Sequence, residues 1–225
     1  MRHAALLYIC QTPRPDVTGE LACALPEDVA LREYGMLDGL TPREIAALAP
    51  QPDEARLVTR LSDGRPAAVA EARLFPLAAR RLREAEWEDP AFCVLMCTGA
   101  FPPLPHSGPF QTAHDLLHGD PTLSSRREAL GVILPDPDQL QQAQRWWGGG
   151  LLPERMAFAS PYEGDSALVG AANALRQAGA SVLVLDCMGY TLEQSLQIEA
   201  ATGLPVALPR QKVIDEILRL CSTKE

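Results

Sequence analysis

The sequence predicts an α/β fold in which each half of the chain supplies about four strands of a mostly parallel sheet with helices on both faces. Short apolar, β-rich runs alternate with helix-like segments along all 225 residues, which is typical of βαβ units. Two of these runs, 92–97 and 181–187, match closely: each ends at a cysteine that is followed two residues later by a glycine. Such runs are typical of buried parallel strands.

The first half begins with a strand over 4–10, which cannot continue past Pro13. Alternating runs around Asp63-Gly64 predict a β-hairpin, and Thr41 followed by Pro42 is typical of a helix start. Pro- and Gly-rich residues 100–110 predict a loop long enough to be a lid. The remaining predicted elements are a helix or irregular segment over 17–26, strands over 29–34, 56–61, 66–71 and 92–97, and helices over 41–48 and 75–86.

The second half repeats the alternation. Thr191 and Gln194 form a capping-box signature for a helix that Gly203 closes. Glycines 148–150 predict a helix-to-strand turn, and they lack the spacing of a phosphate-binding loop. The predicted strands are 130–134, 155–159, 181–186 and 205–208, and the helices are a short one from 120, then 137–147, 165–178, 191–202 and 212–220.

The bulk properties exclude several classes of protein. A net charge of −9 without a basic stripe argues against nucleic-acid binding. There is neither a run of about 18 apolar residues nor a signal-peptide pattern, so we expect no membrane segment and a cytoplasmic protein. Six cysteines without a CxxC pair are expected to be reduced thiols. His114 and His118 have metal-ligand spacing but no evident third ligand, so we predict neither a metal nor a cofactor.

Cys97 and Cys187 are the candidate catalytic residues. Ligands of open α/β sheets bind at the carboxyl ends of the strands, where both thiols are expected. Two thiols in one site can act as a proton acceptor and a proton donor. The helix predicted from Leu192 favours a thiolate at Cys187. The alternative is that both are buried packing residues.

The candidate substrate-binding residues flank these cysteines and the first strand. Arg14 follows the first strand, and its planar fork suits a carboxylate, although a surface role is the commoner one for arginine. Backbone N–H groups after each cysteine could stabilise developing negative charge. The complete set is Gln11, Thr12, Arg14, Thr98, Gly99, Met188, Gly189 and Tyr190.

Three segments together resemble the AroM family: 95–101 (LMCTGAF), 185–190 (LDCMGY) and 9–16 (ICQTPRPD). That family is similar to the aspartate/glutamate/hydantoin racemase superfamily, whose members carry two active-site cysteines. The resemblance implies two similar lobes with a cleft between them. It implies a first lobe over 1–112, a second over 113–208, and a C-terminal helix over 209–225 that returns to the first.

These features lead to one expected function and two rivals. We expect a cofactor-independent racemase or isomerase that uses Cys97 and Cys187 at the carbon next to a carboxylate or carbonyl of a small molecule. One rival is a single-cysteine isomerase or decarboxylase on the same fold. The other is a non-catalytic protein that binds a small carboxylate. A homo-oligomer is left open.

Overall fold

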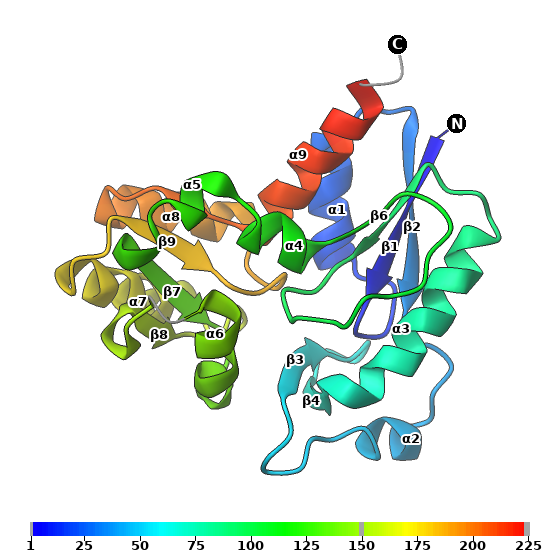
Figure 1. The fold of residues 1–225 in the computed structure, drawn as a ribbon, viewed down its shortest axis with the longest axis horizontal. Coiled ribbons are helices and arrows are strands. Elements are labelled where there is room, and N and C mark those ends of the chain that lie inside the picture. The colour runs from blue at the N-terminus through cyan, green and yellow to red at the C-terminus, as the bar shows by residue number, and fades with distance from the viewer. Residues whose placement is uncertain (1, 149–150, 223–225) are drawn as a thin grey trace. The chain divides into compact units, whose positions relative to one another are not determined.

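A computed structural model describes residues 2–148 and 151–222 of the chain (Figure 1). The chain divides into two compact units. The first holds the residues up to Ala113 together with those from Ile214 onward, and the second runs from His114 to Val213. Each unit has its own parallel four-stranded sheet with helices, which confirms the predicted α/β class.

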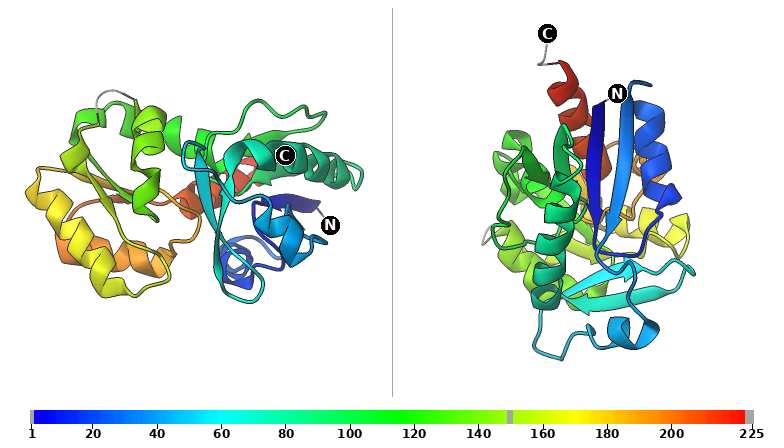
Figure 2. Two further views of the ribbon diagram at one scale, coloured as in Figure 1. Left: turned by 90° about the horizontal axis from the view of Figure 1, so that it is seen from below. Right: turned by 90° about the vertical axis from the view of Figure 1, so that its right-hand side faces the viewer.

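The sheet of the first unit has the strand order β2-β1-β5-β6, and all its pairs are parallel. Figure 2 (right) shows β1 and β2 running side by side. The central strands are buried from Ala4 onward in β1 and throughout β5 because helices cover the sheet, which explains why these stretches are apolar. The strands are β1 (Arg2–Tyr8), β2 (Val29–Gly35), β5 (Phe92–Leu95) and β6 (Phe110–Thr112), and the helices are α1 (Pro15–Ala24), α2 (Pro42–Ala46) and α3 (Glu71–Glu86).

A hairpin lies outside this sheet, as the Asp-Gly turn predicts. It pairs β3 (Arg56–Arg60) with β4 (Pro66–Ala70) in antiparallel register. The Thr41 hydroxyl accepts a hydrogen bond from the N–H of Glu44, and Glu44 bonds back, so the predicted helix start is a complete capping box.

The sheet of the second unit has the order β10-β9-β7-β8, again all parallel. Alternate residues of β9 enter two separate cores: Val182 and Val184 pack on one face, Leu183 and Leu185 on the other. The strands are β7 (Leu130–Leu134), β8 (Met156–Phe158), β9 (Val182–Leu185) and β10 (Val206–Ala207).

Helices α7 and α8 follow the predicted boundaries closely, whereas α6 begins at Leu140 and α9 at Pro209, each three residues from its predicted start, and α4 was not predicted. Gly203 takes a left-handed φ of 70° and ends α8, as predicted. Gly148 ends α6 at a φ of 74°, whereas glycines 149 and 150 of the predicted turn lie outside the described residues. No helix in the described part of the chain is long and apolar enough to cross a bilayer. The helices are α5 (Pro121–Ser124), α6 (Leu140–Trp147), α7 (Asp165–Gln177) and α8 (Leu192–Thr202), while α4 (Ala113–His118) and α9 (Pro209–Ser222) carry the chain between the units.

Three sequence-based boundaries need correction. Helix α3 begins at Glu71 rather than at Phe75, so Pro76 lies inside it. The helix tolerates Pro76 because the preceding turn is stabilised by Leu74, which is fully buried. Strand β6 was not predicted, because three residues after a Pro-rich loop carry too little pattern. Strands β5 and β9 each end two residues before their cysteine, so both thiols lie in loops rather than at the last strand residue.

Candidate active site

Cys97 lies in the turn that follows β5. Its N–H donates to the carbonyl of Leu95 at 3.0 Å, and its sulfur accepts the N–H of Gly99 at 3.4 Å. The residue is 6% exposed. A Cβ at Gly99 would lie 2.5 Å from Cδ2 of Leu57 on the hairpin, so only glycine fits this loop as it stands.

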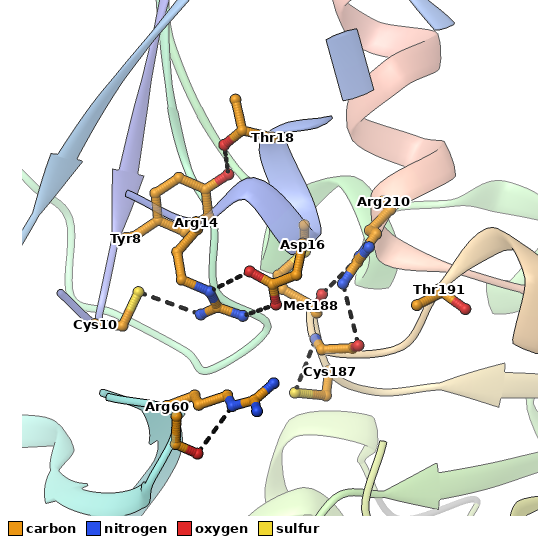
Figure 3. Close-up of polar contacts among 12 residues, drawn as sticks. Tyr8, Cys10, Arg14, Asp16, Thr18, Arg60, Cys187, Met188, Thr191 and Arg210 are labelled. Atoms are coloured by element: carbon orange, nitrogen blue, oxygen red, sulfur yellow. Dashed lines mark hydrogen bonds and ion pairs between the residues drawn. The ribbon is translucent and has the colours of Figure 1, made fainter. Parts of the chain in front are cut away.

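Cys187 lies in the matching turn after β9, within the second unit (Figure 3). Its N–H donates to the carbonyl of Leu185 at 2.9 Å, and its sulfur accepts the N–H of Gly189 at 3.3 Å. The thiol is half-buried. A Cβ at Gly189 would lie 2.9 Å from the Tyr162 hydroxyl, so this loop is also closely packed around its glycine.

The two cysteines therefore have the same local geometry in two separate units. In each, the chain turns directly after the strand, and the glycine two residues later aims its N–H at the sulfur. A backbone N–H that points at sulfur stabilises the thiolate more than the thiol. Each loop thus places one backbone donor where it would favour the thiolate form of its cysteine.

Two other cysteines lack this environment. Burial raises the pKa of Cys93, in the middle of β5, to about 12. Burial also raises the pKa of Cys10, although Nη1 of Arg14 donates to its sulfur at 3.3 Å. Both thiols stay protonated at neutral pH, as packing cysteines do.

Arg14 follows β1, and its guanidinium donates two hydrogen bonds to the carboxylate of Asp16 (Figure 3). The Nε–Oδ1 distance is 2.8 Å and the Nη2–Oδ2 distance is 2.7 Å, and the arginine side chain is 11% exposed. This is the two-pronged geometry in which arginine binds a carboxylate. A ligand carboxylate that used this edge of the guanidinium would have to displace Asp16, and a substrate contact of Arg14 stays a prediction.

The neighbouring candidates Gln11 and Thr12 are also held within the first unit. The hydroxyl and N–H of Thr12 donate to Asp38 at 2.6 and 2.7 Å. The Gln11 side-chain oxygen accepts from Ser62 of the hairpin turn. Gln11 also borders a pocket of about 360 Å³ that is walled by apolar residues of α2 and the hairpin. These contacts fix the loop after β1, and direct contact of either residue with a ligand stays a prediction.

The remaining candidates lie next to the two thiols. Thr98 and Met188 are almost fully buried. Tyr190 is completely buried, and its hydroxyl donates to the carbonyl of Ala159 at 2.7 Å. Burial raises the pKa of Tyr190 well above its usual range. Its side chain therefore anchors the loop in this structure, and a role against the substrate stays a prediction.

The histidine pair packs as aromatic rings. His114 and His118 stack with centroids 4.1 Å apart, and His118 lies 4.0 Å from the ring of Trp147. Among the described residues, no group of three or more His, Cys, Asp or Glu side chains is arranged to hold a metal ion. Burial, with smaller contributions from His114 and Arg127, lowers the pKa of His118 to about 3.

This low pKa predicts an acid-sensitive second unit. An unfolded histidine titrates near 6.5, so between about pH 6.5 and 3 the unfolded chain binds the proton that the folded chain rejects. Stability should fall as the pH drops through this window. Between pH 7 and pH 4, the free energy of unfolding should decrease by about 1–3 kcal/mol less in the His118→Phe variant than in the wild type. Urea unfolding at each pH measures this difference. An equally steep loss in the variant would contradict the assignment.

The structure adds two residues that the sequence did not single out as part of the site. Asp186 is buried and accepts the indole N–H of Trp147 at 2.7 Å. Arg210 was missed entirely: it is 1% exposed and donates to the carbonyls of Met188 and Gly189. One signal was available, because a cation in the first turn of a helix opposes the helix dipole and needs another reason to be there.

Comparisons with known proteins agree with this fold. Unliganded arylmalonate decarboxylase superposes with a TM-score of 0.60 at 13% identity, over 100% of this chain and 95% of that one. Maleate isomerase Iso from Pseudomonas putida S16 superposes with a TM-score of 0.61 at 12% identity, over 98% of this chain and 93% of that one. Allantoin racemase from Klebsiella pneumoniae superposes with a TM-score of 0.59 at 10% identity, over 99% of this chain and 89% of that one.

At these identities the likeness establishes a shared fold. No curated protein matches the chain. The family model described as AroM protein matches residues 4–219, which is nearly the whole sequence. The chain belongs to the AroM family.

Proposed function

We propose that this protein is a cofactor-independent racemase or isomerase that acts at the carbon next to a carboxylate or carbonyl of a small molecule. The observation that carries the proposal is the matched pair of thiols, each after a parallel strand and each receiving a glycine N–H. The solved structures with this fold include a racemase, an isomerase and a decarboxylase, so the proposed chemistry lies within what the fold supports elsewhere.

The proposed step uses the two sulfurs as a base and an acid. One sulfur, as the thiolate, takes the proton from the α-carbon and becomes a thiol. The electron pair left on carbon delocalises into the adjacent carbonyl, where N–H groups and a cation can stabilise it. The other thiol donates its proton to the opposite face of the carbon and becomes the thiolate, so charge and protons balance.

A screen in deuterated water tests this function. The protein is incubated with a panel of amino acids, hydantoins and dicarboxylates, and each compound is analysed by NMR. Deuterium at one α-carbon, with inversion of that centre, is the expected result. Release of carbon dioxide, or isomerisation without α-exchange, would instead favour the single-cysteine rival, in which a lone nucleophile adds to the substrate. Binding without any exchange would favour the non-catalytic rival.

Arg14 and Asp16 give the proposal a pair of opposite predictions. Arg14→Ala should weaken binding of the carboxylate found in the screen by about 2 kcal/mol or more, because a charge-assisted pair is lost. Asp16→Asn should strengthen binding, because it removes the carboxylate that occupies the fork. Isothermal titration measures both. Arg80→Ala, which removes a surface pair with Glu84, is the control and should leave binding unchanged.

The biological setting follows from the same proposal. The partner is a small carboxylate metabolite rather than nucleic acid or a membrane, and the compartment is the cytoplasm, where the thiols stay reduced.

A further inference from the structure

The peptide group between Met188 and Gly189 is held at both ends. At its oxygen end, Nε of Arg210 donates to the carbonyl of Met188 at 2.8 Å (Figure 3). At its nitrogen end, the N–H of Gly189 donates to the sulfur of Cys187 at 3.3 Å. Nη2 of Arg210 also donates to the next carbonyl, that of Gly189, at 3.1 Å. One guanidinium thus connects to the thiol through a single amide.

Arg210 occupies a position that is energetically unfavourable for a cation. The side chain is 1% exposed, and removing a charge from water is unfavourable. It also lies in the first turn of α9, where the helix dipole disfavours a cation. Hydrogen bonds to two carbonyls satisfy some of its donors and polarise those amides, and a polarised amide has a more strongly donating N–H.

We propose that Arg210 is a positioning residue that fixes and polarises the amide bonded to Cys187, so that Cys187 is the thiolate, and hence the base, in the resting enzyme. The role as a base rests on the proposed function. The thiolate itself does not, because it is a property of the protein without substrate.

Other groups around Cys187 in its own unit also influence its charge. The negative charge of the adjacent Asp186 carboxylate disfavours a thiolate at Cys187 by repulsion. That carboxylate is itself stabilised by the indole N–H of Trp147. The phenol of Tyr190, with Cys187 and Asp186 close by, remains neutral because burial raises its pKa. The Tyr162 hydroxyl borders Gly189. The guanidinium of Arg210 contributes positive charge next to this loop through its hydrogen bonds to the carbonyls of Met188 and Gly189.

The test is the pH dependence of Cys187 alkylation in the substrate-free protein. Iodoacetamide is applied from pH 5 to 10, and the rate at Cys187 is followed by peptide mass spectrometry. Arg210→Gln keeps a hydrogen-bond donor but removes the charge, and it should raise the pH midpoint of alkylation by about one unit or more. The exposed Cys23 provides an internal reference whose midpoint should not move.

Two further variants make the result decisive. Arg210→Lys keeps the charge but not the two-point contact with the carbonyls, so it should raise the midpoint by less than Arg210→Gln does. Arg219→Gln, at an exposed ion pair on the same helix, should leave the midpoint unchanged. The same Cys187 midpoint in wild type and a folded Arg210→Gln variant would overturn the proposal, as would a Lys variant shifted as far as the Gln variant. A negative deuterium screen would count against the racemase and leave this result standing.

Discussion

Replacing either Cys97 or Cys187 by serine is expected to abolish turnover in both directions, a loss of at least about 10²–10⁴-fold. A hydroxyl is far less acidic than a thiol, so serine can neither form the base nor easily return the proton. Exchange of the α-proton with solvent should survive on the one face still served by a thiol. The measurement is inversion and deuterium incorporation, followed separately for each substrate enantiomer.

The structure supplies a matched control for these variants. Cys93→Ser changes a thiol that is close in sequence but whose pKa burial raises to about 12, so it should affect stability without removing catalysis. Full activity in either Cys97→Ser or Cys187→Ser would eliminate the two-base mechanism. It would leave the other cysteine as a lone nucleophile.

Gly131→Ala is expected to destabilise the second unit by about 1–3 kcal/mol, since it overpacks the core. A Cβ at Gly131 on β7 would lie 2.9 Å from Cβ of Ala180 and 3.0 Å from Cβ of Leu175. Both atoms are attached directly to the backbone, so neither can swing aside. Urea unfolding of the two proteins measures the difference in free energy.

Gly170 provides the control of opposite sign. It lies inside α7, and a Cβ there would meet nothing within 4 Å. Gly170→Ala should therefore stabilise the protein by about 0.5–1 kcal/mol, because alanine loses less backbone freedom in a helix. Equal effects at the two glycines would contradict the packing described for β7.

The sequence predicted those parts of the fold that depend on local chemistry. The Thr41-Pro42 helix start, the Thr191 capping box, the Asp63-Gly64 hairpin and the apolar runs of β7 and β9 were all local signals of this kind. Strand β6 was not predicted because it forms by pairing with β5, which its own short sequence does not indicate. The start of α3 at Glu71 was not predicted because the burial of Leu74 outweighs the tendency of Pro76 to interrupt a helix.

The matching loops of the two candidate cysteines were predictable, and the contacts around them were less so. Cys97 and Cys187 stood out because two strand-loop patterns match, and the structure gives both the same glycine N–H. The pairing of Arg14 with Asp16 was not foreseen, since residues two apart could equally have faced different ways. Arg210 is 23 residues from Cys187 in sequence, and only the packing of α9 brings it to the same loop.

The first turnovers in deuterated water test most directly whether two thiols serve one carbon from opposite faces. With the compound found in the screen, we expect early product to carry deuterium at the α-carbon while unreacted substrate keeps its proton, because different groups remove and return the proton. Product that keeps the proton of its substrate would show a single base acting on both faces, and would contradict the two-thiol mechanism.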